Sequence, residues 1–218
     1  MNSRETLQTD LHVFGGFNPK LPESYRNEPY LMLGNIQPAL QRDVQRQMDD
    51  LRLVGGDTMN YWIEGYRDEL AATIREWDFL LINDSEARLL AREHGLARAA
   101  EIILGMGPRI LVVKRGEHGA VLFWCGGYFS VPGYLLPKVL DPTGAGDCFA
   151  GGFIGYLAQQ GAGAGPGELD LKLLRNAVVY GSVMGSFCCE CFGVDRFRTL
   201  TRAEIDGRFQ EFKTITSF

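Results

Sequence analysis

Short apolar runs alternate with helical patterns from about residue 30 onward. Three strands are predicted in the first half of the chain, over residues 30–34, 51–55 and 79–82. The third is apolar at every position, which is typical of a parallel strand covered on both faces. One helix that opens at Pro38 and another over 66–77 separate these strands, because their apolar positions recur at helical spacing. The alternation predicts an α/β fold around a mainly parallel sheet.

The second half of the chain continues this alternation and adds a hairpin. Helices are predicted over residues 83–93, 97–106, 145–160, 169–190 and 202–212, and strands over 109–114, 120–124 and 128–131. Gly116 and Gly119 predict a turn into the last two strands, which are close enough in sequence to pair as a hairpin. The stretch GAGAGPGELD at 161–170 predicts a flexible loop, since glycine and proline interrupt regular structure.

The composition is that of an ordinary globular protein. With 218 residues, 45% of them hydrophobic, the chain is long enough for one domain with a sizeable core. A net charge of −5 argues against a general nucleic-acid binder, which needs clustered Lys and Arg. The polar start lacks the apolar core of a signal peptide, and the apolar run 177–189 is too short to span a bilayer. We expect a cytoplasmic protein with neither a nucleic-acid nor a membrane partner.

Five cysteines raise the question of a metal site or of disulfides. Three stand together in Cys188-Cys189-Glu190-Cys191, but zinc sites normally pair two spaced clusters, and the sequence holds no second one. An odd count also argues against a disulfide framework. We expect reduced cysteines that pack as small hydrophobic side chains on a buried helix.

The stretch Asp141-Pro142-Thr143-Gly144-Ala145-Gly146-Asp147 is the most informative segment. It predicts a glycine-rich turn that opens a helix, where small residues let the backbone approach a ligand and first-turn N–H groups point at it. Such a turn suits an anion. Asp147 would repel a phosphate unless it takes a proton from the group that attacks the phosphate. The segment therefore indicates phosphoryl transfer to a hydroxyl; the alternative is a glycine-rich helix start with a capping Asp.

The longer string DPTGAGDCFAGGF, residues 141–153, resembles the second signature of the ribokinase-like (PfkB) family of carbohydrate and nucleoside kinases. All seven positions of the family pattern D-x-T-G-A-G-D fit. The resemblance implies a three-layer α/β sandwich and transfer of the γ-phosphate of ATP to an alcohol group of a sugar or nucleoside. It implies further that Gly144, Ala145 and Gly146 form the anion hole, with Asp147 as the base.

Cation ligands are also implied by this resemblance. Asp141 and Thr143 look like the family's ligands for a monovalent cation such as K⁺. The segment Asn83-Asp84-Ser85-Glu86 matches the family motif N-x-x-E, which implies that Asn83 and Glu86 help to place Mg²⁺ and phosphate. The same spacing also fits a helix capping box that needs no function.

Residues 112–119 resemble the strand and turn that lie beneath the nucleotide in the family. Gly116 and Gly119 would allow close backbone approach, and Lys114 or Arg115 would meet phosphate oxygens. A hairpin turn with two glycines is the alternative.

The helix predicted over 169–190 carries further candidates. Ser182 and Gly185 resemble positions that close the family's adenine pocket, although helix packing through small residues explains this composition equally well. The chain holds no G-x-x-x-x-G-K-[ST], so a Walker-type phosphate loop is not the device here.

The family match starts late in the chain. Members begin with strands, a diglycine motif and a lid, and nothing here corresponds to that segment. We interpret residues 1–18 as a remnant of the lid or substrate segment, and 19–218 as a ribokinase-like core whose N-terminal strands are missing. The segment Asp57–Trp62 resembles a central segment of a bacterial subgroup of the family. A sheet that loses its first strands exposes an edge, so a homo-oligomer is expected.

Two other functions compete with the kinase. A non-catalytic nucleotide-binding or assembly module derived from a truncated kinase fits the missing acceptor half, whereas the intact Asp147 favours the enzyme. A dinucleotide-binding oxidoreductase is disfavoured, because the glycines lie late in the chain and the acidic residue expected about 20 positions after a first strand, turn and helix is not identifiable.

Overall fold

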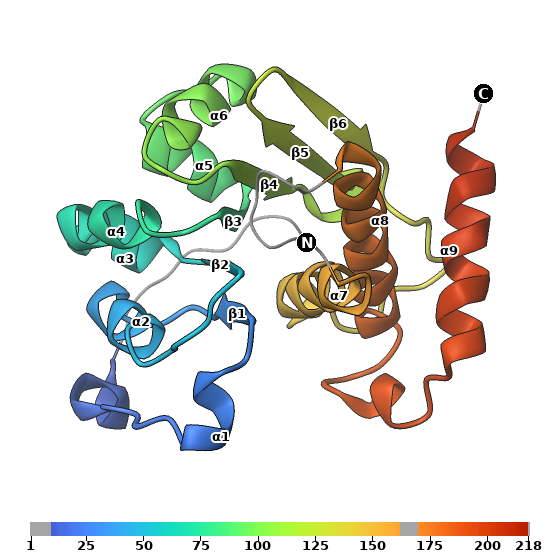
Figure 1. The fold of residues 1–218 in the computed structure, drawn as a ribbon. Coiled ribbons are helices and arrows are strands. Elements are labelled where there is room, and N and C mark those ends of the chain that lie inside the picture. The colour runs from blue at the N-terminus through green and yellow to red at the C-terminus, as the bar shows by residue number, and fades with distance from the viewer. Residues whose placement is uncertain (1–9, 162–169, 218) are drawn as a thin grey trace.

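The computed structural model describes residues 10–161 and 170–217. Its centre is a six-stranded sheet whose strands lie side by side in chain order (Figure 1). The strands are β1 (Tyr30–Leu33), β2 (Leu53–Gly56), β3 (Phe79–Asn83), β4 (Ile110–Lys114), β5 (Ala120–Trp124) and β6 (Gly127–Val131). The first four are parallel, and β5 and β6 return antiparallel as the predicted hairpin. The mainly parallel sheet predicted from the sequence is therefore confirmed.

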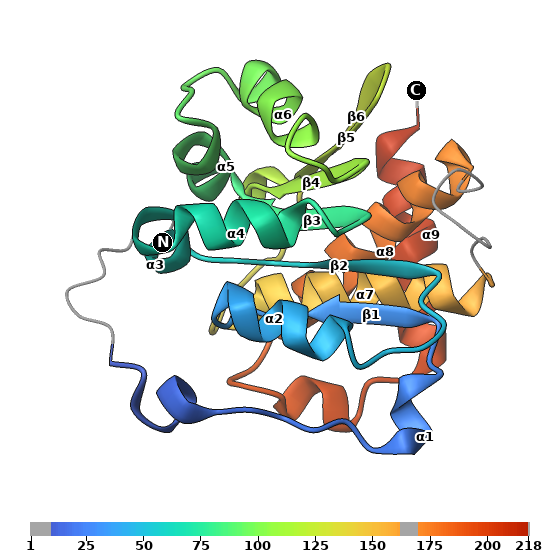
Figure 2. The ribbon, with the colours of Figure 1, turned by 60° about the vertical axis from the view of Figure 1, so that its left-hand side comes forward.

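Helices cover both faces of the sheet, which gives three layers (Figures 1 and 2). One face carries α2 (Pro38–Gln45), α3 (Asn60–Gly65), α4 (Arg67–Ile74), α5 (Asp84–Ala91) and α6 (Leu96–Leu104). The other face carries α7 (Ala145–Gln159) and α8 (Leu171–Cys188), with α9 (Arg202–Thr216) packed outside α8. Short turns complete the chain: η1 (His12–Gly16), α1 (Glu23–Arg26), η2 (Gly116–His118) and η4 (Asp195–Arg198).

Two hydrophobic cores lie on the two faces of the sheet and explain why the first four residues of β3 are apolar. Phe79 and Leu81 pack into the core shared with α7 and α8, and Leu80 and Ile82 pack into the core on the opposite face. All four side chains are 0% exposed, because successive residues of a strand point to opposite faces. Burial of each such side chain contributes roughly 1.5–3 kcal/mol.

The structure differs from the sequence prediction between β2 and β3. One helix was predicted over 66–77; the chain forms α4 within that range and also α3, which was not predicted and ends just before Tyr66, a residue with φ −134°. Helix α4 ends at Ile74, because the chain must turn there so that Asp78 N can bond Val54 O at 2.7 Å and lead into β3. The predicted loop at 161–170 lies, apart from its two ends, outside the described residues.

Candidate functional site

Polar residues gather where the parallel strands end. Asp57 directly follows β2, Asn83 is the last residue of β3, and Lys114 is the last residue of β4. Asn83 and Lys114 face each other in the β3–β4 register. Since ligands of open α/β sheets bind at the carboxyl ends of the strands, this edge is the expected place for a site.

The signature turn opens α7 as its sequence predicts. Gly144 is the N-cap and has φ +81°, a left-handed conformation that glycine adopts without strain. Cys148 N then donates to Gly144 O at 2.9 Å, which closes the first helical turn. The start of a 15-residue helix therefore follows the glycine-rich turn, and the helix dipole favours an anion there.

Lys114 lies against this turn. A Cβ built on Gly146 would lie 3.1 Å from Lys114 Nζ, so a larger residue at 146 would crowd the ammonium group. The lysine is half-buried, and it comes from β4, more than 30 positions earlier in the chain. The fold thus brings together the basic residue and the anion-hole residues that the sequence singled out separately.

Asp57 is a site residue that the sequence analysis did not select. It is only 6% exposed, and within the described part of the chain its Oδ1 has no hydrogen-bond partner. Burial raises the pKa of Asp57 to about 6; the Lys114 ammonium opposes this shift, and the Asp147 and Glu86 carboxylates add to it. These four charged groups therefore share one space. The available signal was a carboxylate directly after a strand whose every residue is buried.

Asn83 and Glu86 form a complete capping box at the start of α5. Asn83 Oδ1 accepts from Glu86 N at 2.8 Å, and Glu86 Oε2 accepts from Asn83 N at 2.9 Å. The capping alternative is thus real, but Glu86 is also buried and close enough to Asp57 to act on its charge. The capping role of the N-x-x-E segment and its predicted role in placing Mg²⁺ and phosphate are therefore compatible with each other.

Asp141 and Thr143 lie before the turn, toward solvent. Asp141 Oδ1 accepts from Thr143 N at 3.0 Å, and this bond, together with the Thr143 hydroxyl and the Gly193 backbone, lowers the pKa of Asp141. Asp141 is therefore held ionised beside the signature, while its role as a monovalent-cation ligand stays a prediction.

The two glycines after β4 have different surroundings. Gly116 has φ +56° at the start of η2, and Gly119 has φ +87° beside the end of β6. A Cβ on Gly119 would meet Val131 O at 2.0 Å, so the close approach here is to the protein's own backbone. This geometry favours a structural reason for Gly119.

Replacing Gly119 with alanine is expected to lower the free energy of unfolding by about 3 kcal/mol. The backbone of the alanine would be strained at this positive φ, and its Cβ would also overlap Val131 O. Gly126, in the β5–β6 turn, is the matched control: its φ is +95°, but nothing lies within 4 Å of its Cβ position. Gly126→Ala should cost about 1 kcal/mol. Urea unfolding measures both, and equal losses would contradict the structural role.

Ser182 and Gly185 both lie on α8. Ser182 Oγ donates to Val178 O at 3.1 Å within the helix, and a Cβ on Gly185 would lie 3.1 Å from Ala145 O. Helix packing therefore accounts for Gly185. The glycine lets α8 approach the first residue of α7, next to the signature turn.

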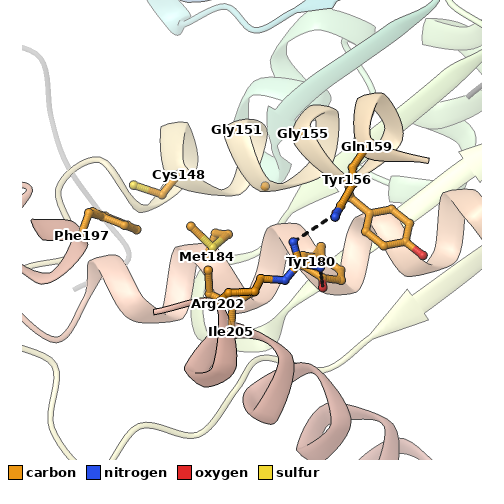
Figure 3. Close-up of a pocket in the computed structure, with 11 residues that line it drawn as sticks. Cys148, Gly151, Gly155, Tyr156, Gln159, Tyr180, Met184, Phe197, Arg202 and Ile205 are labelled. Atoms are coloured by element: carbon orange, nitrogen blue, oxygen red, sulfur yellow. Dashed lines mark hydrogen bonds between the residues drawn. The ribbon is translucent and has the colours of Figure 1, made fainter. Parts of the chain in front are cut away.

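A separate groove of about 470 Å³ lies between α7, α8 and α9 (Figure 3). It is lined mainly by apolar and aromatic side chains, among them Met184, Phe197 and Ile205. Arg202 reaches toward α7, where Nη1 donates to Gln159 Oε1 at 3.3 Å (Figure 3). The groove contains none of the charged residues at the strand ends, so it is distinct from the candidate site.

The cysteines are free thiols in varied surroundings. Cys188 is buried at the end of α8, as expected, whereas Cys125 is exposed because it lies in the β5–β6 turn. Among the described residues, no three His, Cys, Asp or Glu side chains form a ready-made metal site. In the same part of the chain, every helix is too short or too polar to cross a membrane.

Comparison with known proteins gives the family. Residues 25–199 match the pfkB family carbohydrate kinases. The chain is 30% identical over 141 residues to a cytidine kinase of Thermococcus kodakarensis, covering 62% of this chain and 50% of that protein. It is 32% identical over 150 residues to a 2-dehydro-3-deoxygluconokinase of Thermoproteus tenax, covering 67% of this chain and 39% of that protein. The chain thus spans about half the length of these relatives or less.

Solved structures share the fold. A nucleoside kinase of Methanocaldococcus jannaschii, an archaeal member of the ribokinase family, superposes with a TM-score of 0.69 at 21% identity, covering 92% of this chain and 60% of that one. A putative ribokinase II of E. coli in complex with ATP and Mg²⁺ gives a TM-score of 0.66 at 22% identity, covering 84% and 59%. Together with the family match, these likenesses show that the chain belongs to the pfkB family of carbohydrate kinases.

Proposed function

We propose that this chain forms the phosphate-handling part of a kinase that transfers the γ-phosphate of ATP to an alcohol group of a sugar or nucleoside. The observation that carries the proposal is the contact between Lys114 and the signature turn, 3.1 Å from the Cβ position of Gly146. A lysine ammonium and a helix start that converge on one point form a site for phosphate oxygens. Asp147 is exposed in the first turn of the same helix, where an incoming hydroxyl can reach it.

The residues divide the chemistry among them. The backbone of Gly144, Ala145 and Gly146 would stabilise the charge that develops on the transferred phosphoryl group, and Lys114 would neutralise part of it. Asp147 would accept the proton of the attacking hydroxyl. Phosphoryl transfer depends mainly on such positioning and charge stabilisation, so this set is sufficient for the phosphate half of the reaction.

The carboxylates at the strand ends fit Mg²⁺. Asp57 Oδ1 and Thr58 Oγ1 are buried oxygens that lack a hydrogen-bond partner among the described residues, and hard oxygen ligands are those that Mg²⁺ prefers. We assign Asp57 to the cation together with Asn83 and Glu86. When bound, the ion would neutralise charge on the nucleotide phosphates. Asp141 and Thr143 would hold a monovalent cation such as K⁺.

For the acceptor substrate we propose only a chemical class. The named relatives act on cytidine and on a sugar acid, which supports a small polyhydroxylated acceptor. We propose residues 1–18 as part of a lid or substrate segment, 19–218 as the ribokinase-like core with the nucleotide and phosphate site, and the cytoplasm as the location. A homo-oligomer is also retained, because among the described strands β1 pairs with β2 alone.

A non-catalytic nucleotide-binding or assembly module is the second candidate, because the residues assigned above handle phosphate and cations, and only Asp147 addresses an acceptor. Calorimetry with ATP, with and without Mg²⁺, tests the shared part of both proposals. A radiolabel-transfer assay over a panel of sugars and nucleosides then separates them. Binding with transfer supports the kinase, binding without transfer supports the module, and absence of binding contradicts both.

A further inference from the structure

One fully buried amide holds the backbone beside Asp57. Gln41 lies on α2 and is 1% exposed. Its Nε2 lies 2.8 Å from Gly34 O, 3.2 Å from Asp57 O and 3.4 Å from Leu33 O. These carbonyls belong to the last residue of β1 and to the residues just after β1 and β2, where the strand ladder stops.

The contacts join two strands at the point where Asp57 leaves the sheet. Asp57 N donates to Leu33 O at 3.1 Å, and the Gln41 amide bonds the carbonyl of Asp57 from the other side. An amide NH₂ has two donors, so it can serve carbonyls of both strands at once. Buried carbonyls without a donor cost free energy, which makes this arrangement hard to replace by packing alone.

The following segment is held as well. Trp62 Nε1 donates to Asn35 Oδ1 at 2.9 Å, and Asn35 lies just after β1. Residues 57–62 are therefore held at both ends: Gln41 on α2 bonds Asp57, and Asn35, in the connection from β1 to α2, bonds Trp62.

We propose that Gln41 is a positioning residue, which fixes the backbone of Asp57 so that its carboxylate stays beside Lys114, Glu86 and Asp147. The inference rests on the cation role of Asp57 in the proposed function. One observation favours positioning over simple core packing. Among the described residues Gln41 Oε1 has no partner, whereas Nε2 contacts three carbonyls, so the side chain is used for its donors.

The test is Gln41→Met, which keeps the length of the side chain and removes its donors. We expect Mn²⁺ binding to the whole chain, followed by electron paramagnetic resonance, to weaken by about tenfold, a usual effect of losing a group that orients a ligand. We also expect faster hydrogen exchange of the Asp57 amide, which bonds Leu33 O. Unchanged Mn²⁺ affinity together with unchanged exchange would overturn the proposal.

Thr73→Val is the matched control. Thr73 is 0% exposed, and its hydroxyl lies within hydrogen-bond distance of two carbonyls, Pro38 O on α2 at 3.1 Å and Glu69 O on α4 at 2.8 Å. The substitution removes one buried donor between α2 and α4 without touching Asp57. It should lower stability but leave both Mn²⁺ affinity and Asp57 exchange unchanged; a loss equal to that of Gln41→Met would assign both effects to general loosening.

A double-mutant cycle with Asp57→Asn shows whether Gln41 affects Mn²⁺ affinity through Asp57. If Gln41 acts through Asp57, Gln41→Met causes no further loss of Mn²⁺ affinity in the Asp57→Asn background, although it still lowers stability. An equal fold-loss in both backgrounds would overturn the proposal. If the unaltered chain binds no Mn²⁺, the cation assignment in the proposed function fails, and Asp57 amide exchange in Gln41→Met against Thr73→Val still decides whether Gln41 positions Asp57.

Discussion

Asp147→Asn is expected to reduce phosphoryl transfer by about 10²- to 10⁴-fold, the range of a lost general base. An asparagine amide cannot take the proton of the attacking hydroxyl, whereas its size and its place in the first turn of α7 are unchanged. Because Asp147 is exposed, the substitution should leave folding and ATP affinity nearly intact. Initial rates with the acceptor that responds best in the panel, together with ATP calorimetry, measure the two effects separately.

Asp195→Asn controls for loss of a surface carboxylate. The side chain of Asp195 is 67% exposed and lies in η4, where its ion pair within the described part of the chain is with Arg198. Its replacement should leave the rate within twofold, since an exposed pair contributes little. Transfer by Asp147→Asn at more than a tenth of the unaltered rate would remove Asp147 from the role of base.

Asp57→Asn is expected to stabilise the fold and weaken cation binding at once. The folded-state pKa of Asp57 is about 6, above the ordinary 3.8, so the folded protein holds this proton more tightly than the unfolded chain does. The resulting stability is present below pH 4 and is lost as the pH rises through 6. Asparagine carries no charge, so the free energy of unfolding at pH 8 should rise by about 3 kcal/mol, with little change at pH 4.

Urea unfolding at pH 4, 5 and 8 gives this difference, and Mn²⁺ titration gives the loss of binding. Asp78→Leu is the contrasting variant, because burial also raises the pKa of Asp78, but its Oδ2 accepts from Val54 N at 2.9 Å. Leucine has no acceptor, so Val54 N would be left without this partner and the protein should be destabilised at pH 8. A stability loss in Asp57→Asn at pH 8 would show that the buried carboxylate is structural.

The local pattern of apolar residues and glycines was sufficient to predict much of the fold. The apolar run of β3 predicted a strand covered on both faces, and the glycines of the signature predicted the start of α7. Prediction was weakest between β2 and β3, where the short helix α3 was missed and α4 ends at Ile74, three residues before the predicted end, because the chain must return to the sheet. Helical periodicity does not report such ends.

The candidate site was predictable only in pieces. Lys114, the N-x-x-E segment and the signature are separate strings in sequence, and each had a structural alternative. The capping box at Asn83 and the backbone packing of Gly119 show that some of those alternatives are also true. Asp57 and Gln41 carry no motif of their own, since their roles arise from burial and from carbonyls supplied by other strands.

The sequence by itself determined the family, the strand and helix types and the chemistry of the signature turn, because these depend on residues close together in the chain. Only the tertiary structure decided that Lys114 lies against Gly146, that Asp57 is buried among three charged groups, and that Gln41 joins the ends of β1 and β2. The physical reason is that parallel strands bring their carboxyl ends to one edge, so residues far apart in sequence come to share one poorly solvated space.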